Sequence, residues 1–351
     1  MTGEPASGGL PAFLKSKIFI ALVVVLALGV GFAFGAVRWA FQQVEAPGPL
    51  AAAQIHVVPK GMGVSQIARE MEASGIIADE KLFRLYARYR KLDSSLHAGE
   101  YEFQPGVSMV DVLAQLAAGK TVLRFVTIPE GLSSREAAAL VAAAEGMKGI
   151  AEVPPEGSIL PETYTFTLDE NRAALVGRMQ DAMKKTLAEL WAGRAEGLPV
   201  KTPEEALILA SIVEKETGLP EERQRVAAVF VNRLNRGMML QSDPTVVYAI
   251  TKGERELGRA LRFKDLAVKD PYNTYYTRGL PPGPICNPGR EAIAAVLNPI
   301  QSKELYFVAD GSGGHAFAET LVEHNRNVAK WRKVQQEHRR QQRLRQQQNN
   351  Q

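Results

Sequence analysis

The stretch that decides the fold is EEALILASIVEKETGLPEERQRVAAVFVNRLNRGMMLQSDPTVVYAI, residues 204–250. Residues 207–213 form an apolar run in which only Ser211 is polar, and Gly-Leu-Pro at 218–220 predicts where this helix ends. A second amphipathic helix is predicted over 221–236, because apolar side chains recur there at helical spacing. Residues 241–245 predict a polar turn, since the residue before a proline is disfavoured in a helix.

Two carboxylates, Glu214 and Glu216, close the apolar run and flank Lys215. A carboxyl group at the end of an apolar helix loses part of its hydration, which raises its pKa and lets it act as a general acid near neutral pH. Positions i and i+2 of a helix point about 200° apart, so the two side chains cannot face one cleft. Spacing does not choose between them, and a solvated charge cluster is the alternative interpretation.

Several long motifs occur in order around this stretch. They are ASIVEKET at 210–217, NRLNRGMMLQSDPTVVYAI at 232–250, YNTYYTRGLPPGPICNPG at 272–289 and YFVADGSGGHAF at 306–317. From about residue 50 to residue 330, the chain resembles the MltG family of endolytic murein transglycosylases, also called the YceG-like family. The resemblance implies that Glu216, the second Glu of the EKE run, is the catalytic acid, with Glu214 as the runner-up.

The same motifs supply the candidates that hold the glycan or orient the acid. Residues 272–276 combine aromatic rings with amide and hydroxyl groups, which is how proteins bind sugars. The eight candidates are Asn232, Gln241, Asp243, Thr245, Tyr248, Asn273, Thr274 and Tyr275.

The activity implied by the resemblance is cleavage of the β-1,4 bond between N-acetylmuramic acid and N-acetylglucosamine within peptidoglycan strands, which terminates glycan elongation. The substrate's own C6 hydroxyl attacks and leaves a 1,6-anhydro end, so one protein carboxyl suffices where ordinary glycosidases use two. Penicillin-binding proteins are partners implied by the resemblance. Two rival hypotheses are a water-using muramidase with Asp243 as second carboxylate, and a membrane-anchored glycan-binding scaffold without catalysis.

An uncharged apolar stretch, IFIALVVVLALGVGFAFGAV, fills residues 18–37 and is long enough to span a bilayer. Lys15 and Lys17 precede it, which predicts a cytoplasmic segment at 1–17. We expect a single-pass protein of the bacterial inner membrane, with a linker at 38–53 and a periplasmic C-terminal domain. A cleaved signal peptide is the alternative, but its apolar region is normally shorter and no convincing cleavage site follows.

The predicted fold class is α+β. Residues 54–122 read as strand, helix, helix and strand, which resembles a small LysM-type glycan-binding subdomain of α/β character. A larger mixed α+β catalytic domain is expected at 123–331. Residues 332–351 form a basic, Gln-rich tail, for which frayed helix or disorder is expected.

Other functional classes find little support. The net charge is only +4, which does not favour nucleic acid as a partner. A single cysteine, Cys286, excludes an internal disulfide and a cysteine-rich metal site. The five histidines lack zinc-helix spacing, and there is no phosphate loop or dinucleotide fingerprint, so neither a metal nor a cofactor is predicted.

Overall fold

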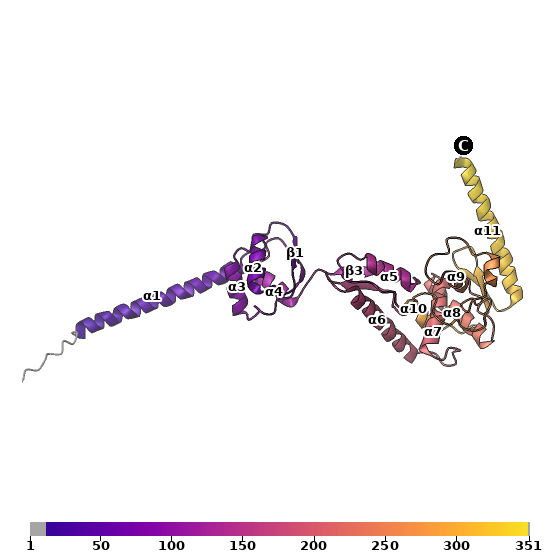
Figure 1. Ribbon diagram of the computed structural model, residues 1–351, viewed down its shortest axis with the longest axis horizontal. Coiled ribbons are helices and arrows are strands. Elements are labelled where there is room, and N and C mark those ends of the chain that lie inside the picture. Colours follow the sequence, from indigo (N-terminus) through magenta and orange to yellow (C-terminus); the bar gives the residue numbers. More distant parts are fainter. Residues whose placement is uncertain (1–11, 350–351) are drawn as a thin grey trace, which may run out of the picture. The chain divides into compact units, whose positions relative to one another are not determined.

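The structure is a computed structural model that describes residues 12–349. Residues 1–11, which make up most of the segment predicted to be cytoplasmic, and residues 350–351 lie outside the described part. The chain divides into two compact units, Met1–Val122 and Leu123–Gln351, whose elements are labelled in Figure 1. Both units combine helices with short strands, which confirms the predicted mixed α+β class.

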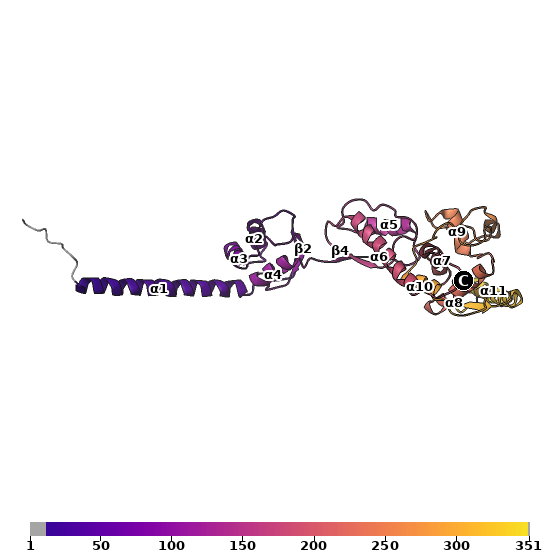
Figure 2. The same cartoon turned by 90° about the horizontal axis from the view of Figure 1, so that it is seen from below.

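The first unit has the strand-helix-helix-strand order expected from the sequence, preceded and followed by a helix. Its elements are α1 Ala12–Glu45, β1 Gln54–Val58, α2 Val64–Ala73, α3 Glu80–Tyr89, β2 Gly99–Phe103 and α4 Met109–Ala118. The strands pair antiparallel, with Gln54 opposite Phe103 and Val58 opposite Gly99. Helices α2, α3 and α4 gather beside this pair of strands in both cartoon views (Figure 2).

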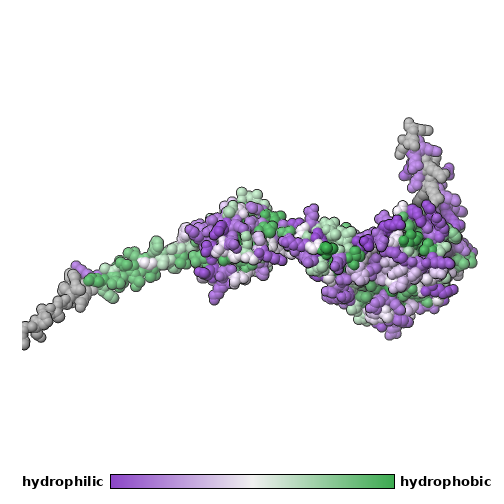
Figure 3. Space-filling view, viewed as in Figure 1, coloured by the Kyte–Doolittle hydropathy of each residue, from purple (hydrophilic) through white to green (hydrophobic). Residues whose placement is uncertain are grey.

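Helix α1 contains the predicted membrane-spanning stretch. Within residues 12–349 it is the one helix long and apolar enough to cross a membrane, over Lys17–Glu45, with a mean hydropathy of 2.8 in its 18-residue apolar window. None of its apolar window is buried by the protein, and Figure 3 shows hydrophobic side chains along it. This helix is compatible with a single-pass anchor.

The core of the first unit is built from large apolar side chains of its helices and strands. Phe83 of α3, Tyr101 and Phe103 of β2, and Leu113 of α4 are fully or almost fully buried. Local sequence sets the helix ends: the Asp79 carboxylate accepts the backbone N–H groups of residues 81 and 82 at the start of α3. The first unit therefore has its own hydrophobic core, to which Val44 of α1 also contributes.

The second unit is mainly helical, with two pairs of antiparallel strands. Its elements are β3 Arg124–Thr127, α5 Ser134–Ala143, β4 Thr163–Phe166, α6 Arg172–Ala192, α7 Pro203–Glu216, α8 Pro220–Asn235, α9 Asp243–Thr251, the 3-10 helix η1 Phe263–Ala267, α10 Arg290–Leu297, β5 Tyr306–Ala309, β6 His315–Ala318 and α11 Leu321–Asn349. Strand β3 pairs with β4, and β5 pairs with β6. Helices α7, α8 and α10 pack together and form the main core.

Helix α7 is the centre of that core. The Thr202 hydroxyl accepts the Glu205 backbone N–H at 3.2 Å, and Pro203 occupies the first helical position, where no N–H partner is needed. Apolar residues of its middle, including Leu209, Ile212 and Val213, are completely buried. The helix ends at Glu216 because Thr217 is extended, with φ −141° and ψ 131°.

One expectation differs from the structure. The polar turn predicted at 241–245 is wrong beyond Ser242, because α9 begins at Asp243. Pro244 is tolerated there since the first turn of a helix leaves its N–H groups without internal partners.

The basic tail, for which frayed helix or disorder was expected, is helical through Asn349 as the continuation of α11.

One side chain closes the C-terminal end of α5. The guanidinium of Arg172, at the start of α6, donates to five backbone carbonyls. They belong to Val141, Ala142, Ala144, Met147 and Gly149, at distances of 2.8–3.1 Å. A helix leaves its last carbonyls unpaired, so Arg172 supplies the missing donors and ties α5 to α6.

Replacing Arg172 with Met should lower the free energy of opening of α5 by about 2–3 kcal/mol, because the carbonyls lose their donors while the apolar stem remains. Hydrogen exchange of the full chain in detergent, read over residues 134–143, would measure it. The control is Arg135→Met on the exposed side of α5, which should stay within about 0.5 kcal/mol of wild type. Unchanged protection in Arg172→Met would refute this role.

Candidate active site

Glu216 lies at the C-terminal end of α7, where the helix leaves the core. Its Oε1 accepts a hydrogen bond of 2.5 Å from the hydroxyl of Ser242. Ser242 is the residue that precedes α9 and is only 1% exposed. The carboxyl is therefore held between the end of one helix and the beginning of another.

A buried cluster of hydroxyl groups fixes Ser242. The Thr245 hydroxyl donates to the Ser242 carbonyl at 2.6 Å, and the Ser242 backbone N–H donates to the Thr274 hydroxyl at 3.0 Å. The two threonine hydroxyls are 2.8 Å apart, and neither residue is exposed. Thr245 and Thr274 thus position the serine that contacts Glu216.

The surroundings of Glu216 favour its protonated form. Burial raises the pKa of Glu216 from its ordinary value of 4.5 to about 7, and the Asp243 carboxylate adds to that increase. The Ser242 hydrogen bond opposes this increase, as do the electrostatic effects of the His315 and Arg233 side chains. A carboxyl group with a pKa near 7 is present in both protonation states at neutral pH, as a general acid and base requires.

Glu214 faces a different environment, as the helical spacing predicted. Its Oε2 accepts the Gly289 backbone N–H at 2.9 Å, and the Arg223 guanidinium lies 4.0 Å from its Oε1. Burial raises the pKa of Glu214, and the Gly289 hydrogen bond opposes the increase. This carboxyl is only 6% exposed and anchors the start of α10.

Asp243 joins the Glu216 site to a pocket of about 480 Å³. Asp243 and Tyr248 of α9 form one side, and Lys215 of α7 contributes another part of the lining. The Lys215 ammonium donates to the Gly131 carbonyl at 3.1 Å, which fixes the loop before α5. The pocket therefore presents an aromatic ring, a carboxylate and an ammonium group, and it is linked to Glu216 through Asp243, because Glu216 itself does not line it.

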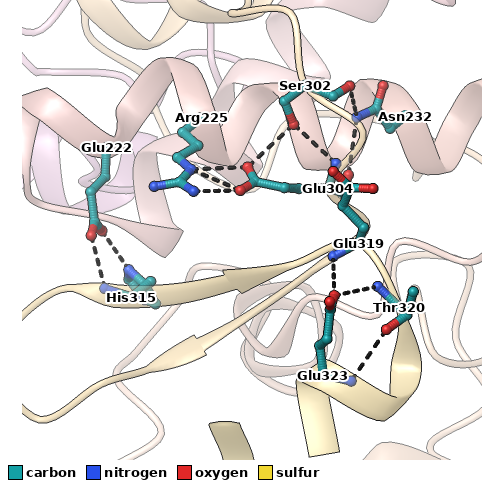
Figure 4. A network of polar contacts seen from close by, with 9 residues as sticks. All are labelled: Glu222, Arg225, Asn232, Ser302, Glu304, His315, Glu319, Thr320 and Glu323. Atoms are coloured by element: carbon teal, nitrogen blue, oxygen red, sulfur yellow. Dashed lines mark hydrogen bonds and ion pairs between the residues drawn. The ribbon is translucent and has the colours of Figure 1, made fainter.

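The β5–β6 hairpin is attached to α8 by polar contacts (Figure 4). Glu222 accepts from the His315 backbone N–H at 2.8 Å, and its other oxygen is 2.6 Å from the His315 ring nitrogen Nδ1. Arg225 forms an ion pair with Glu304. These contacts fix His315 and the β5–β6 hairpin against α8.

The predicted site residues divide into two groups. The first group is accessible: Gln241 and Asp243 are exposed, and Tyr248 and Tyr275 are half-buried. In the second group, Thr245, Asn273 and Thr274 are buried, and the half-buried Asn232 uses its amide for hydrogen bonds within the protein. The Tyr275 hydroxyl donates to Asp243 at 2.7 Å. Gln241 adopts the left-handed backbone conformation, with φ 51°, at the turn before α9.

Two predicted candidates use their side-chain amides within the fold. The Asn232 amide donates to the Ser302 and Glu304 carbonyls at 2.9 and 3.0 Å. The Asn273 amide donates to the Leu266 and Val268 carbonyls at 2.9 and 2.7 Å. Their amide N–H groups therefore support the walls of the site from inside the protein.

Three residues of the site were missed from the sequence. Ser242 precedes Asp-Pro, which is a helix-start signal that a capping argument would have detected. Arg233 is 8% exposed and donates to the Leu240 and Leu305 carbonyls at 2.7 and 2.6 Å, so its nearness to Glu216 depends on tertiary packing. Glu156, which accepts the Ser134 N–H at 2.7 Å and the Tyr248 hydroxyl at 3.4 Å, had no local signal.

The fold and the site define a mixed α+β protein with an apolar N-terminal helix and one carboxyl poised to exchange a proton. Residues 56–330 match the YceG-like family, and the chain belongs to that family. It is 31% identical over 318 residues to an endolytic murein transglycosylase of Streptococcus pneumoniae strain D39, covering 78% of this chain and 57% of that protein. The chain thus spans less than two thirds of that relative's length.

A second relative agrees. An endolytic murein transglycosylase of Bacillus subtilis is 31% identical over 307 residues, covering 78% of this chain and 83% of that protein. The family match and these two relatives confirm the resemblance inferred from the motifs. A solved yceG-like protein from Listeria monocytogenes is 30% identical, with a TM-score of 0.48, covering 79% of this chain and 99% of that one.

The raised pKa of Glu216 makes stability depend on pH. Between pH 4.5 and about 7 the unfolded chain has released the Glu216 proton while the folded chain still holds it. The contribution of Glu216 to the free energy of unfolding is therefore full below pH 4.5 and is lost as the pH rises through 7. The free energy of unfolding of Glu216→Gln, relative to that of wild type, should therefore be about 2 kcal/mol higher at pH 8 than at pH 4.5, allowing for partial exposure. Urea unfolding of the full chain at both pH values would measure this. Glu204→Gln, exposed on the same helix, should not reproduce the difference.

Ser242→Ala should raise the pKa of Glu216 further, by about one unit, because the lost hydrogen bond stabilises the carboxylate. Carboxyl ¹³C NMR of glutamate-labelled protein would follow the titration, with Glu216→Gln identifying the signal. Ser211→Ala is the control, since that hydroxyl lies on α7 but donates to the Ile208 carbonyl. An unchanged titration in Ser242→Ala would mean that the serine does not tune the acid.

Proposed function

We propose that this protein is an endolytic murein transglycosylase that cleaves the β-1,4 bond between N-acetylmuramic acid and N-acetylglucosamine inside glycan strands. The observation that carries the proposal is Glu216, a carboxyl with a pKa of about 7 that is held by Ser242 and influenced by Asp243, a residue that lines an open pocket. Family membership and the names of the relatives support the same reaction.

The proposed reaction uses Glu216 twice. Its protonated carboxyl donates a proton to the glycosidic oxygen as the bond from that oxygen to C1 of the muramyl residue breaks. The C6 hydroxyl of the same residue forms the new bond to C1, and its proton passes to the Glu216 carboxylate. The acid is regenerated, and the strand ends in a 1,6-anhydro residue without use of water.

The other residues divide between binding and positioning in this proposal. Tyr248 lines the pocket and packs against Tyr272 with ring centroids 4.8 Å apart, which suits the apolar face of a sugar. Asp243, Gln241 and Tyr275 offer polar groups to sugar hydroxyls. The remaining candidates, Asn232, Thr245, Asn273 and Thr274, act through the fold. Glu214 is the runner-up acid, and the hydrogen bond that it accepts from the Gly289 backbone N–H favours a structural role.

Finer parts of the proposal concern the whole protein. We infer a cytoplasmic segment at 1–17, a membrane helix at 18–37, a linker at 38–53, a LysM-like glycan-binding subdomain at 54–122, a catalytic domain at 123–331 and a basic tail at 332–351. The protein then resides in the bacterial inner membrane with its catalytic domain in the periplasm. Cleavage there would terminate glycan elongation, with penicillin-binding proteins as partners.

A water-using muramidase is a second candidate, because Asp243 lies close enough to Glu216 to raise its pKa. Asp243 would then activate water as the second carboxylate. The hydrogen bond from the Tyr275 hydroxyl fixes the orientation of the Asp243 side chain. The two reactions differ in product, since hydrolysis leaves a reducing end and no anhydro sugar. A glycan-binding scaffold is the third candidate.

Mass spectrometry of the products formed from purified glycan strands tests the proposal. The full chain should release fragments with 1,6-anhydro-muramyl ends, and Glu216→Gln should lower the rate by at least about 100-fold while still binding glycan. Because the acid must be protonated, activity should fall as pH rises above about 7.

Glu214→Gln and Asp243→Asn are the comparison variants. Loss of cleavage in Glu214→Gln alone would reassign the acid but keep the reaction. Reducing ends without anhydro sugar, abolished by Asp243→Asn, would establish the muramidase. Binding without cleavage by wild type would establish the scaffold.

A further inference from the structure

An apolar groove lies between α1 and α3 in the first unit. Its volume is about 320 Å³, and its lining is apolar or aromatic throughout. The main contributors are Val37, Phe41 and Val44 of α1 and Leu85, Tyr86 and Tyr89 of α3. The Phe41 ring packs edge-on against both tyrosines, with centroids 5.3 Å from Tyr89 and 6.3 Å from Tyr86.

Part of this groove is exposed. Leu85 is 61% exposed and Tyr89 is 66% exposed, whereas Val44 at its inner end is 2% exposed. Both exposed residues lie on one face of α3, since they are four positions apart in the helix. Two large, exposed apolar side chains next to an apolar groove indicate a binding surface.

The groove begins where the uncharged part of α1 ends. Residues 18–37 carry no charge, and at about 1.5 Å per residue they span about 30 Å, the thickness of the bilayer's hydrocarbon core. Val37 then lies at the edge of the hydrocarbon, and Phe41 lies about 6 Å beyond it. Trp39, 55% exposed between them, is typical of a membrane interface. The groove is therefore at the depth of the lipid headgroups.

Positive charges are concentrated on α3, the helix that forms one wall of the groove. Five exposed cations, Lys81, Arg84, Arg88, Arg90 and Lys91, lie within 11 residues of α3 and its C-terminal end. The Arg90 guanidinium donates to the Tyr86 hydroxyl at 2.8 Å and lies 5.8 Å from the centre of that ring. A cation is thus fixed on the wall of the groove, where it would meet the phosphate of a lipid whose chain lies inside.

We propose that this juxtamembrane groove binds an acyl chain of an anionic phospholipid, with the headgroup held by the basic residues of α3. Helix α3 then lies in the headgroup layer, and the lipid sets the height of the first unit above the bilayer. The apolar lining, the cationic rim and the continuity with a helix whose apolar surface is unburied together favour lipid over protein. This inference depends on membrane insertion of α1 and is independent of the glycan chemistry proposed for Glu216.

Native mass spectrometry of the full chain tests lipid retention. The protein would be released from micelles containing equal amounts of phosphatidylglycerol and phosphatidylcholine with identical acyl chains. Wild type should retain phosphatidylglycerol preferentially, and the double variant Leu85→Glu/Tyr89→Glu should retain about tenfold less. The matched control is Ile55→Glu/Val57→Glu, because these side chains are 56% and 45% exposed on β1, outside the groove.

The cationic rim is tested separately. Arg84→Gln/Arg88→Gln should reduce the preference for phosphatidylglycerol about fivefold or more for each charge removed, without change in the fold by circular dichroism. Hydrogen exchange over residues 80–91 in nanodiscs should be slower with phosphatidylglycerol than with phosphatidylcholine alone, while exchange over 64–73 stays the same.

Equal lipid retention by wild type, the groove variant and the control would overturn the proposal. Hydrogen exchange over residues 80–91 at the same rate with both lipids would also overturn it. Unchanged lipid retention together with loss of self-association in the groove variant would instead assign the groove to a second copy of the chain.

Discussion

Burial of α7 is the constraint on which the rest of the second unit depends. Leu209, Ile212 and Val213 reach zero exposure because α8 and α10 pack against this helix. Its last residue, Glu216, is carried to the edge of the same core, where it loses much of its contact with water. The negative end of the helix dipole also lies there, which further disfavours a carboxylate. Packing for stability thereby produces a group suited to proton transfer.

The two glutamates of the EKE run show how environment assigns a role. Glu214 receives a backbone N–H from Gly289 and faces Arg223, so it is bound into the structure. Glu216 receives one short hydrogen bond from Ser242, which is itself fixed by Thr245 and Thr274. The arrangement resembles many active sites, where a functional group is held by residues that never touch the ligand.

Much of the fold was predictable because its signals are local. The apolar period of α6 and α7, the uncharged stretch of α1 and the strand-helix-helix-strand order of 54–122 were all expected, with small differences in the helix ends. The start of α9 was misjudged, because a proline in the first helical turn has the same sequence signature as a turn. The roles of Asn232 and Asn273 could not be predicted for another reason. The sequence shows which residues carry amide groups, but not which backbone carbonyls, such as those of 302–304, accept their hydrogen bonds.

The sequence by itself determined the α+β class, the membrane-length helix, the family and the pair of carboxyls from which an acid would come. Those follow from composition, periodicity and motifs, which are properties of neighbouring residues. Only the tertiary structure decided which carboxyl meets Ser242, that Arg233 and His315 bear on Glu216, and that Glu156 accepts a hydrogen bond from Tyr248. A pKa depends on burial and on charges brought together from distant parts of the chain, and no local pattern encodes those distances.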